Sequence, residues 1–170
     1  MKLCVYDNVV SKEDNDAHRD ILLKGPFYYG AVDNANSKPT GLINGFFDLD
    51  MKLYPQLKTI REFYLNKIYQ IEPSFKKRPI GVERLNLFLP GENPEFHTDH
   101  KDWITCMFYI NPELSINEGG ETQFHSKEKF HCVSSKPGRL VIFDGGIEHR
   151  ATSFRTHPRL TLVFSFVKLS

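Results

Sequence analysis

The second half of the chain consists of short apolar runs separated by turn residues, and this spacing constrains the fold more than any other feature. Glycine, proline, asparagine and aspartate cluster between the runs, as in Asn111-Pro112 and Asp144-Gly145-Gly146. Such runs are typical of strands in an antiparallel sandwich or jelly roll. The eight predicted strands are residues 82–89, 96–100, 104–110, 121–125, 130–134, 139–143, 149–152 and 159–167.

The first half predicts supporting elements. Residues 2–6 alternate apolar and polar side chains, as a short strand does. Ser11 is a suitable helix N-cap, and the helix that it starts should end before Gly25. In residues 54–71 the apolar positions recur at three- and four-residue steps, with Pro55 in the first turn. This stretch predicts a helix that packs on the outside of the sheet.

Residues 25–50 are rich in glycine, asparagine, aspartate and proline, with interspersed aromatic residues. They form either a lid over a site or a surface loop anchored by its aromatic side chains. We expect one mainly β domain with flanking α-helices across residues 1–170. In it, residues 1–81 support the sheet and residues 82–170 form the core that carries the chemistry.

Composition excludes several classes of protein. Lysine and arginine number 22 and aspartate and glutamate 21, so the net charge of +1 makes a nucleic-acid partner unlikely in general. Cys4, Cys106 and Cys132 form no CxxC pair, which favours reduced thiols. No apolar run is typical of a signal peptide or a membrane span, so we expect a soluble, cytoplasmic protein. The oligomeric state stays open.

His97 and Asp99 are two residues apart, so on an extended strand their side chains point to the same face. His149, from a later predicted strand, would add a second imidazole. Two histidines and one carboxylate occupy one triangular face of an octahedral ion and leave the other positions open, as in non-haem Fe(II) oxygenases. The pattern therefore predicts an iron site.

Arg159 opens the last apolar strand, where an unpaired guanidinium would be costly to bury. An arginine matches a carboxylate as a two-pronged pair, so Arg159 is a candidate anchor for a carboxylate co-substrate. An internal Asp or Glu partner is the alternative. Thr161 shares its face of the strand and could add a hydroxyl.

Taken in order, these motifs resemble the 2-oxoglutarate/Fe(II)-dependent dioxygenases, and most closely their prolyl 4-hydroxylase-like branch. The resemblance covers roughly residues 82–169 and rests on His97-x-Asp99, the segments 119–122 and 137–143, His149 and Arg159. It implies a double-stranded β-helix (a cupin-like jelly roll) that binds Fe(II), with 2-oxoglutarate and O₂ as co-substrates. It leaves open whether ascorbate is needed.

The resemblance also assigns roles to further residues. Tyr109 resembles the tyrosine that assists the arginine in oxygen-sensing prolyl hydroxylases. Asn86 resembles the asparagine of the nucleic-acid demethylases, where an amide would bond the C1 carboxylate of 2-oxoglutarate. Phe88 and Ser165 stand where those demethylases have a tyrosine and a second arginine, which disfavours demethylation. Candidates for the mouth of the site are Trp103, Arg84, Arg150 and Tyr29.

With Asp99 present as a ligand, the resemblance implies hydroxylation of an unactivated C–H bond, with succinate and CO₂ as co-products. The branch suggests a prolyl residue of a peptide or protein as the substrate. A free amino acid or another small metabolite is the enzymatic alternative. A non-catalytic module that senses iron or 2-oxoglutarate is the alternative from another class.

Overall fold

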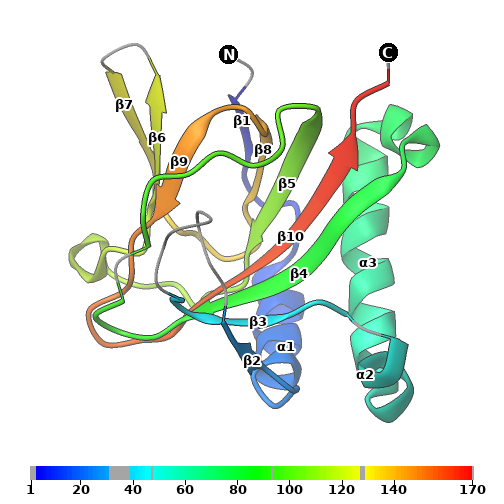
Figure 1. Cartoon of the computed structure of the whole chain (residues 1–170). Coiled ribbons are helices and arrows are strands. Elements are labelled where there is room, and N and C mark those ends of the chain that lie inside the picture. Colours follow the sequence, from blue (N-terminus) through cyan, green and yellow to red (C-terminus); the bar gives the residue numbers. More distant parts are fainter. Residues whose placement is uncertain (1–2, 31–38, 47, 93, 127–128, 170) are drawn as a thin grey trace.

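The structure is a computed structural model that describes residues 3–30, 39–46, 48–92, 94–126 and 129–169. In this part of the chain, a seven-stranded major sheet has the order β1-β8-β5-β10-β4-β3-β2, and a minor sheet has the order β7-β6-β9 (Figure 1). All pairings within the two sheets are antiparallel. The two sheets make up the core of a jelly roll, which confirms the predicted mainly β fold.

The strands are β1 (Leu3–Tyr6), β2 (Tyr28–Tyr29), β3 (Leu42–Asn44), β4 (Ile80–Phe88), β5 (Trp103–Tyr109), β6 (Thr122–Ser126), β7 (Lys129–Val133), β8 (Leu140–Asp144), β9 (Glu148–Ala151) and β10 (Arg159–Val167). The α-helices are α1 (Lys12–Leu22), α2 (Asp48–Leu53) and α3 (Pro55–Ile71). Two short 3₁₀ helices are η1 (Pro73–Lys77) and η2 (Ile116–Glu118). No helix in the described ranges has both the length and the apolarity that a bilayer crossing requires.

The central strand β10 directs alternate side chains to the two faces of the major sheet. Its first eight residues are buried, because helices cover one face of the major sheet and the minor sheet lies over the other (Figure 1). Leu162 and Phe164 alternate with Thr161 and Val163. The first two belong to the apolar cluster that includes α1 and α3, whereas Thr161 and Val163 line a pocket between the sheets. Strand alternation thus separates the stabilising face from the functional face.

Helices α1 and α3 form where the sequence predicts them. Ser11 accepts a hydrogen bond from the backbone N–H of Asp14 at 3.0 Å and caps α1. Pro55 begins α3, and Tyr64 of this helix packs edge-to-face on Phe108 of β5 with ring centroids 4.8 Å apart. Helix α3 therefore covers the outer face of the major sheet, as expected.

Two predictions on local structure were wrong. Residues 96–100 form no strand, because only one bridge, between His97 and His149, holds this segment to the minor sheet. Residues 25–50, predicted as a loop, contribute β2, β3 and the start of α2, and β3 pairs with β4. The possible lid falls largely on residues 31–38, which lie outside the described residues.

Candidate functional site

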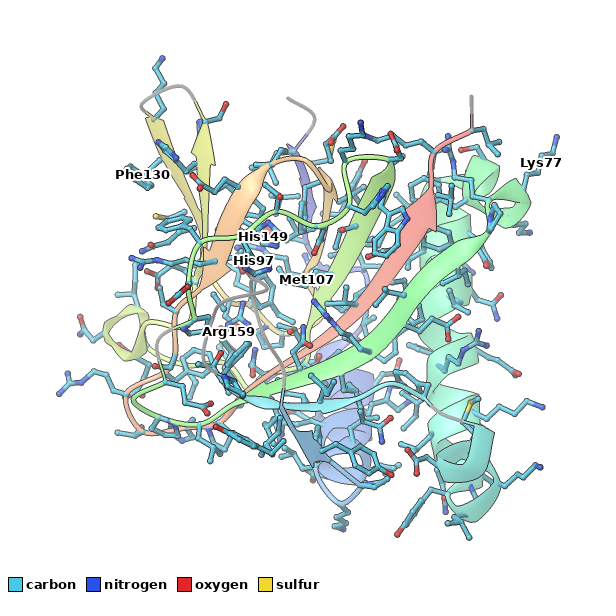
Figure 2. The ribbon with its side chains drawn as sticks, viewed as in Figure 1. Lys77, His97, Met107, Phe130, His149 and Arg159 are labelled. Carbon is cyan, nitrogen blue, oxygen red and sulfur yellow. The ribbon has the colours of Figure 1, made fainter. Side chains whose placement is uncertain are left out.

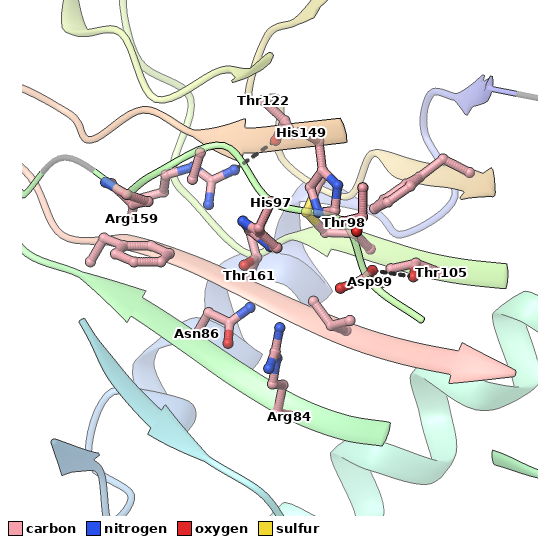
Figure 3. Close-up of a pocket in the computed structure, with 16 residues that line it drawn as sticks. Arg84, Asn86, His97, Thr98, Asp99, Thr105, Thr122, His149, Arg159 and Thr161 are labelled. Atoms are coloured by element: carbon pink, nitrogen blue, oxygen red, sulfur yellow. Dashed lines mark hydrogen bonds between the residues drawn. The ribbon is translucent and has the colours of Figure 1, made fainter. Parts of the chain in front are cut away.

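A cavity of about 150 Å³ lies between the two sheets. Arg84, Asn86, Thr161 and Arg159 line it from β4 and β10 of the major sheet (Figure 3). Facing them are His149 of β9 and the segment that carries His97 and Asp99. Figure 2 places His97, His149 and Arg159 together at the centre of the molecule, whereas Phe130 lies at its periphery. The cavity thus contains the predicted iron ligands and, except for Tyr109, the residues predicted to bind the co-substrate.

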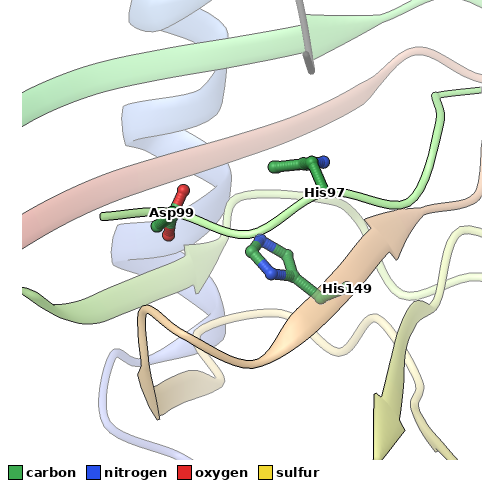
Figure 4. A group of neighbouring side chains, drawn as sticks. All are labelled: His97, Asp99 and His149. Carbon is green, nitrogen blue, oxygen red and sulfur yellow. The ribbon is translucent and has the colours of Figure 1, made fainter. Parts of the chain in front are cut away.

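His97, Asp99 and His149 form a cluster whose possible ligand atoms all lie within 4.8 Å of one another (Figure 4). The bridge between the two histidines explains how they meet. The His97 N–H donates to the His149 carbonyl at 3.0 Å, and the His149 N–H donates to the His97 carbonyl at 2.8 Å. Residues that exchange both bonds in an antiparallel pair direct their side chains to the same face, so both imidazoles point toward one site.

Backbone carbonyls orient both imidazole rings. His97 Nδ1 lies 3.1 Å from the carbonyl oxygen of Glu95, and His149 Nδ1 lies 2.9 Å from that of Ile147. A carbonyl oxygen only accepts, so each Nδ1 carries the proton and each Nε2 keeps its lone pair for a metal. Carbonyl partners on the second nitrogen are common for metal-binding histidines because they fix the tautomer and the ring orientation.

The protonation state of His149 also suits a ligand. Burial lowers the pKa of His149, and the Asp99 carboxylate opposes that shift only in part. The imidazole is therefore neutral at neutral pH, which is the form that binds a cation.

A short chain of hydroxyl groups orients Asp99. Thr105 of β5 donates its hydroxyl to Asp99 Oδ2 at 2.5 Å and lies 3.3 Å from the Ser165 hydroxyl of β10. Gly145 lies directly behind this segment. A Cβ at position 145 would lie 2.5 Å from the His100 carbonyl oxygen and 3.3 Å from Asp99 Cβ. The absence of a side chain at Gly145 therefore lets the Asp99 segment approach the sheet.

Arg159 is 1% exposed and anchored at the other end of the cavity. Its Nε donates to the Gly120 carbonyl at 3.0 Å, and its Nη2 donates to the Thr122 hydroxyl at 2.8 Å. Gly120 has a φ of 78°, and a Cβ there would lie 2.0 Å from the Phe154 ring, so this close turn requires glycine. Burial lowers the pKa of the Arg159 guanidinium, which nevertheless stays charged at neutral pH.

Arg159 has no ion-pair partner among the carboxylates of the described residues. Within this part of the chain, the alternative of an internal Asp or Glu partner is therefore not found. The Thr161 hydroxyl oxygen nearby is buried and finds no hydrogen-bond partner in the part of the chain that the structure describes. A buried cation and a buried unsatisfied hydroxyl both favour an anionic ligand with hydrogen-bond acceptors.

Tyr109 lies behind Arg159 and does not line the cavity. Its ring is 5.4 Å from the guanidinium carbon, and its hydroxyl lies 2.7 Å from Thr122 Oγ1 and 3.0 Å from the Val133 carbonyl oxygen. Burial raises the pKa of Tyr109, so its hydroxyl stays neutral. Tyr109 therefore packs against Arg159 and holds Thr122, and its role toward the co-substrate stays a prediction.

Three of the four mouth candidates lie outside the cavity wall, whereas Arg84 lines it. Trp103 packs against the His100 ring with centroids 5.3 Å apart. Arg150 alternates with His149 along β9, so it faces away, lies over the Phe96 ring and donates to Gln123. Tyr29 is 70% exposed and donates its hydroxyl to the Pro39 carbonyl.

The sequence reasoning missed Thr105 and Ser165 as supports of Asp99, and Thr122 as a support of Arg159. Thr105 and Ser165 occupy inward positions on strands that are otherwise mostly apolar, and this placement was the available signal. Thr122 belongs to the segment 119–122, which sequence analysis used only for the resemblance.

The side chains that line the cavity match two kinds of ligand, a metal ion and a carboxylate. Two imidazoles and a carboxylate favour a divalent transition metal and leave open positions on it. Arg159, with the unsatisfied Thr161 hydroxyl beside it, matches a carboxylate held across the cavity from that metal. The residues present therefore fit both an iron ion and a dicarboxylate.

Comparison with known proteins agrees with this geometry. Residues 85–166 match the family described as the 2OG-Fe(II) oxygenase superfamily. By sequence, no protein with a curated description matches the chain.

Solved structures match almost the whole chain at low sequence identity. A prolyl 4-hydroxylase of Pseudomonas putida has a TM-score of 0.68 at 16% identity and covers 99% of this chain and 93% of its own. A prolyl hydroxylase of Trichoplax adhaerens, solved with a hypoxia inducible factor peptide, has a TM-score of 0.67 at 15% identity, covering 98% and 83%. The carbocyclase SnoK from nogalamycin biosynthesis has a TM-score of 0.69 at 12% identity, covering 98% and 79%.

The match over residues 85–166 identifies this part of the chain as a 2OG-Fe(II) oxygenase domain, and such a domain is an oxidoreductase. The fold is the double-stranded β-helix that these solved structures share. The family match implies Fe(II) and 2-oxoglutarate as the reactive partners.

Proposed function

We propose that this protein hydroxylates an unactivated C–H bond in a reaction that consumes 2-oxoglutarate and O₂ and yields succinate and CO₂. The observation that carries the proposal is the pairing of two sites across one cavity. A cluster of His97, Asp99 and His149 faces Arg159, a buried arginine with no ion-pair partner among the described residues. Either feature alone has a structural explanation, but both together match a metal and a chelating dicarboxylate.

We assign the metal to His97 Nε2, His149 Nε2 and the Asp99 carboxylate, because carbonyls hold both Nδ1 atoms. Arg159 and Thr161 would hold the distal carboxylate of 2-oxoglutarate. Asn86 lines the cavity opposite Thr161 in the β4–β10 register and would bond the proximal carboxylate.

When bound, iron and 2-oxoglutarate together activate O₂ for the attack on the C–H bond. The chain's own residues bind and orient these groups. Arg159 fixes one end of the co-substrate, Thr105 holds the Asp99 carboxylate in position, and Phe143, Val163 and Met107 form an apolar wall that limits water.

For the substrate, we propose a prolyl residue of a peptide or protein, with ascorbate as an optional reductant. The prolyl hydroxylases among the structural relatives support this class. A free amino acid or another small molecule is the second candidate, because SnoK, a carbocyclase, shares the fold to the same degree. A sensing module that binds iron or 2-oxoglutarate without turnover would need the same residues. An experiment distinguishes it from the two enzymatic candidates.

The test is incubation of the Fe(II)-loaded protein with 2-oxoglutarate, O₂ and panels of prolyl peptides and free amino acids. We expect succinate to form faster with the right substrate, and mass spectrometry to detect a product heavier by one oxygen atom. The His149→Ala variant should form neither product. Binding of 2-oxoglutarate without succinate across all panels would contradict the enzyme and favour the sensing module.

A further inference from the structure

The cavity contains a second arginine, Arg84, whose position differs from that of Arg159. Arg84 is opposite Val163 in the β4–β10 register, whereas Arg159 is opposite Phe88. These two rows are four residues apart, or about 13 Å along the strands. In Figure 3, Arg84 points from β4 into the cavity, and Arg159 lies toward its other end.

The Arg84 guanidinium has no hydrogen-bond or ion-pair partner among the described residues. Its Nε is buried without a hydrogen-bond acceptor, and no carboxylate in the described part of the chain forms an ion pair with it. Its neighbour Glu83 faces the other side of β4, where both carboxylate oxygens accept from Arg61. A polar group left unsatisfied in a cavity indicates a ligand that completes it.

The charges of the lining residues indicate whether that ligand is an anion or a cation. Among the described lining residues, the ionised side chains are Asp99, Arg84 and Arg159. A divalent ion with Asp99 leaves one positive charge, and Arg159 adds a second. The two carboxylates of 2-oxoglutarate balance both of these charges. Arg84 then remains as one uncompensated cation inside a partly enclosed site, where such a charge is costly.

We propose that Arg84 binds a carboxylate of the primary substrate. This inference rests on the proposed function and narrows its substrate class. The oxidised carbon belongs to a molecule that carries its own carboxylate near the reacting centre. For a prolyl substrate, this is a proline with a free α-carboxylate, as a free amino acid or a peptide C-terminus, or a proline beside an acidic residue. A neutral internal prolyl residue lacks the required group.

Matched acid and amide pairs test the proposal, with stimulated succinate formation and the one-oxygen product as readouts. The probes are the free L-amino acids and their carboxamides, and Ala-Pro with a free or an amidated C-terminus. Capped peptides with Asp or Asn beside an internal proline complete the set. We expect turnover from acids only, with kcat/KM at least about 100-fold above the matched amide. The kind of acid accepted identifies the source of the carboxylate.

A spectroscopic readout measures binding without turnover. Under anaerobic conditions, an accepted acid should perturb the visible band of the Fe(II)–2-oxoglutarate complex, and its amide should not. The Arg84→Gln variant, which removes the charge but keeps an amide donor, should bring the acid-to-amide ratio of kcat/KM close to one. Its KM for 2-oxoglutarate should stay near the wild-type value. The Arg84→Lys variant should restore part of the ratio, and Arg155→Gln on the surface should leave it unchanged.

Three results would overturn the assignment: amides accepted as well as acids, no response to any acid, or an Arg84→Gln variant in which only the KM for 2-oxoglutarate rises. The third would assign Arg84 to the co-substrate. A failure of the proposed function looks different, since no succinate would then form with or without any probe, whether or not the visible band appears. A thermal unfolding curve of each variant separates misfolding from lost recognition.

Discussion

The two sheets have unequal surroundings. The major sheet is covered on both faces, and its strand β10 is buried along almost its whole length. The minor sheet is covered less completely, because four of the five residues of its edge strand β7 are exposed, on both faces of the strand. Phe130 of this strand is 61% exposed. Most of the stabilising apolar contact therefore lies on the major sheet.

The site nevertheless requires both sheets. The major sheet supplies Arg159 and Thr161, whereas the minor sheet supplies His149 and, through one bridge, positions His97. The co-substrate anchor is thus built into the stable core, and the metal ligands lie on the less covered wall. We expect changes on the minor-sheet side to weaken metal binding without unfolding the protein.

The largest effect on stability should come from the helix-facing side of β10. Leu162 is fully buried among α1 and α3, so Leu162→Ala should lower the free energy of unfolding by about 3 kcal/mol. Phe130→Ala on the exposed edge strand of the minor sheet should change it by less than about 0.5 kcal/mol. Urea denaturation of both variants measures the difference. Equal decreases in the free energy of unfolding would show that the two sheets contribute equally to stability.

A smaller effect should follow from changing the support of one metal ligand. Thr105→Val keeps the shape of the side chain but removes the hydroxyl that donates to Asp99. We expect metal affinity to fall by about 10- to 100-fold, with the unfolding midpoint almost unchanged. Ser165→Ala removes only the outer hydroxyl of the chain and should have a weaker effect. Isothermal titration with Fe(II) under anaerobic conditions compares them, and unchanged affinity in Thr105→Val would contradict this role.

The smallest effect concerns the edge of the major sheet, where Asp7 bonds Arg139 at 2.6 and 3.1 Å. The hydrogen bond from Arg139 lowers the pKa of Asp7 below its ordinary value of about 3.9. The unfolded chain then binds more protons, so this pair stabilises fully above that value and loses its effect as pH falls through the lower folded pKa.

Because Asp7 is half-exposed, Asp7→Asn should cost about 0.5–1 kcal/mol near neutral pH. The difference in free energy of unfolding between wild type and variant should shrink as the pH falls below the ordinary aspartate pKa and vanish below the lower folded pKa of Asp7. Urea denaturation at several pH values measures it. A difference independent of pH would show that the charge of Asp7 is not responsible.

The fold followed from the sequence because strand and turn signals are local. The runs at 104–110 and 159–167 correspond to β5 and β10, and their alternation predicted Thr161 on the face of Arg159. The partners of the Tyr109 hydroxyl, Thr122 and the Val133 carbonyl, did not follow, because they depend on the packing of the two sheets. The same is true of Thr105, whose partner lies six residues earlier on an irregular segment.

His97 and Asp99 show that a correct grouping can rest on a wrong local structure. The predicted strand over 96–100 is absent, yet the two side chains lie close to His149. The long-range bridge between the histidines replaces the strand, and no local pattern encodes such a bridge. Sequence patterns are therefore least reliable for single residues whose position depends on a long-range contact.

One measurement tests the central claim most directly. Titration of the anaerobic protein with Fe(II) and 2-oxoglutarate, followed by visible absorption, reports whether metal and co-substrate bind together at the cavity. We expect a weak charge-transfer band that needs both additions and that is lost in Asp99→Ala, while the far-ultraviolet circular dichroism stays unchanged. No band in the wild type, or an undiminished band in Asp99→Ala, would contradict the assignment of this site.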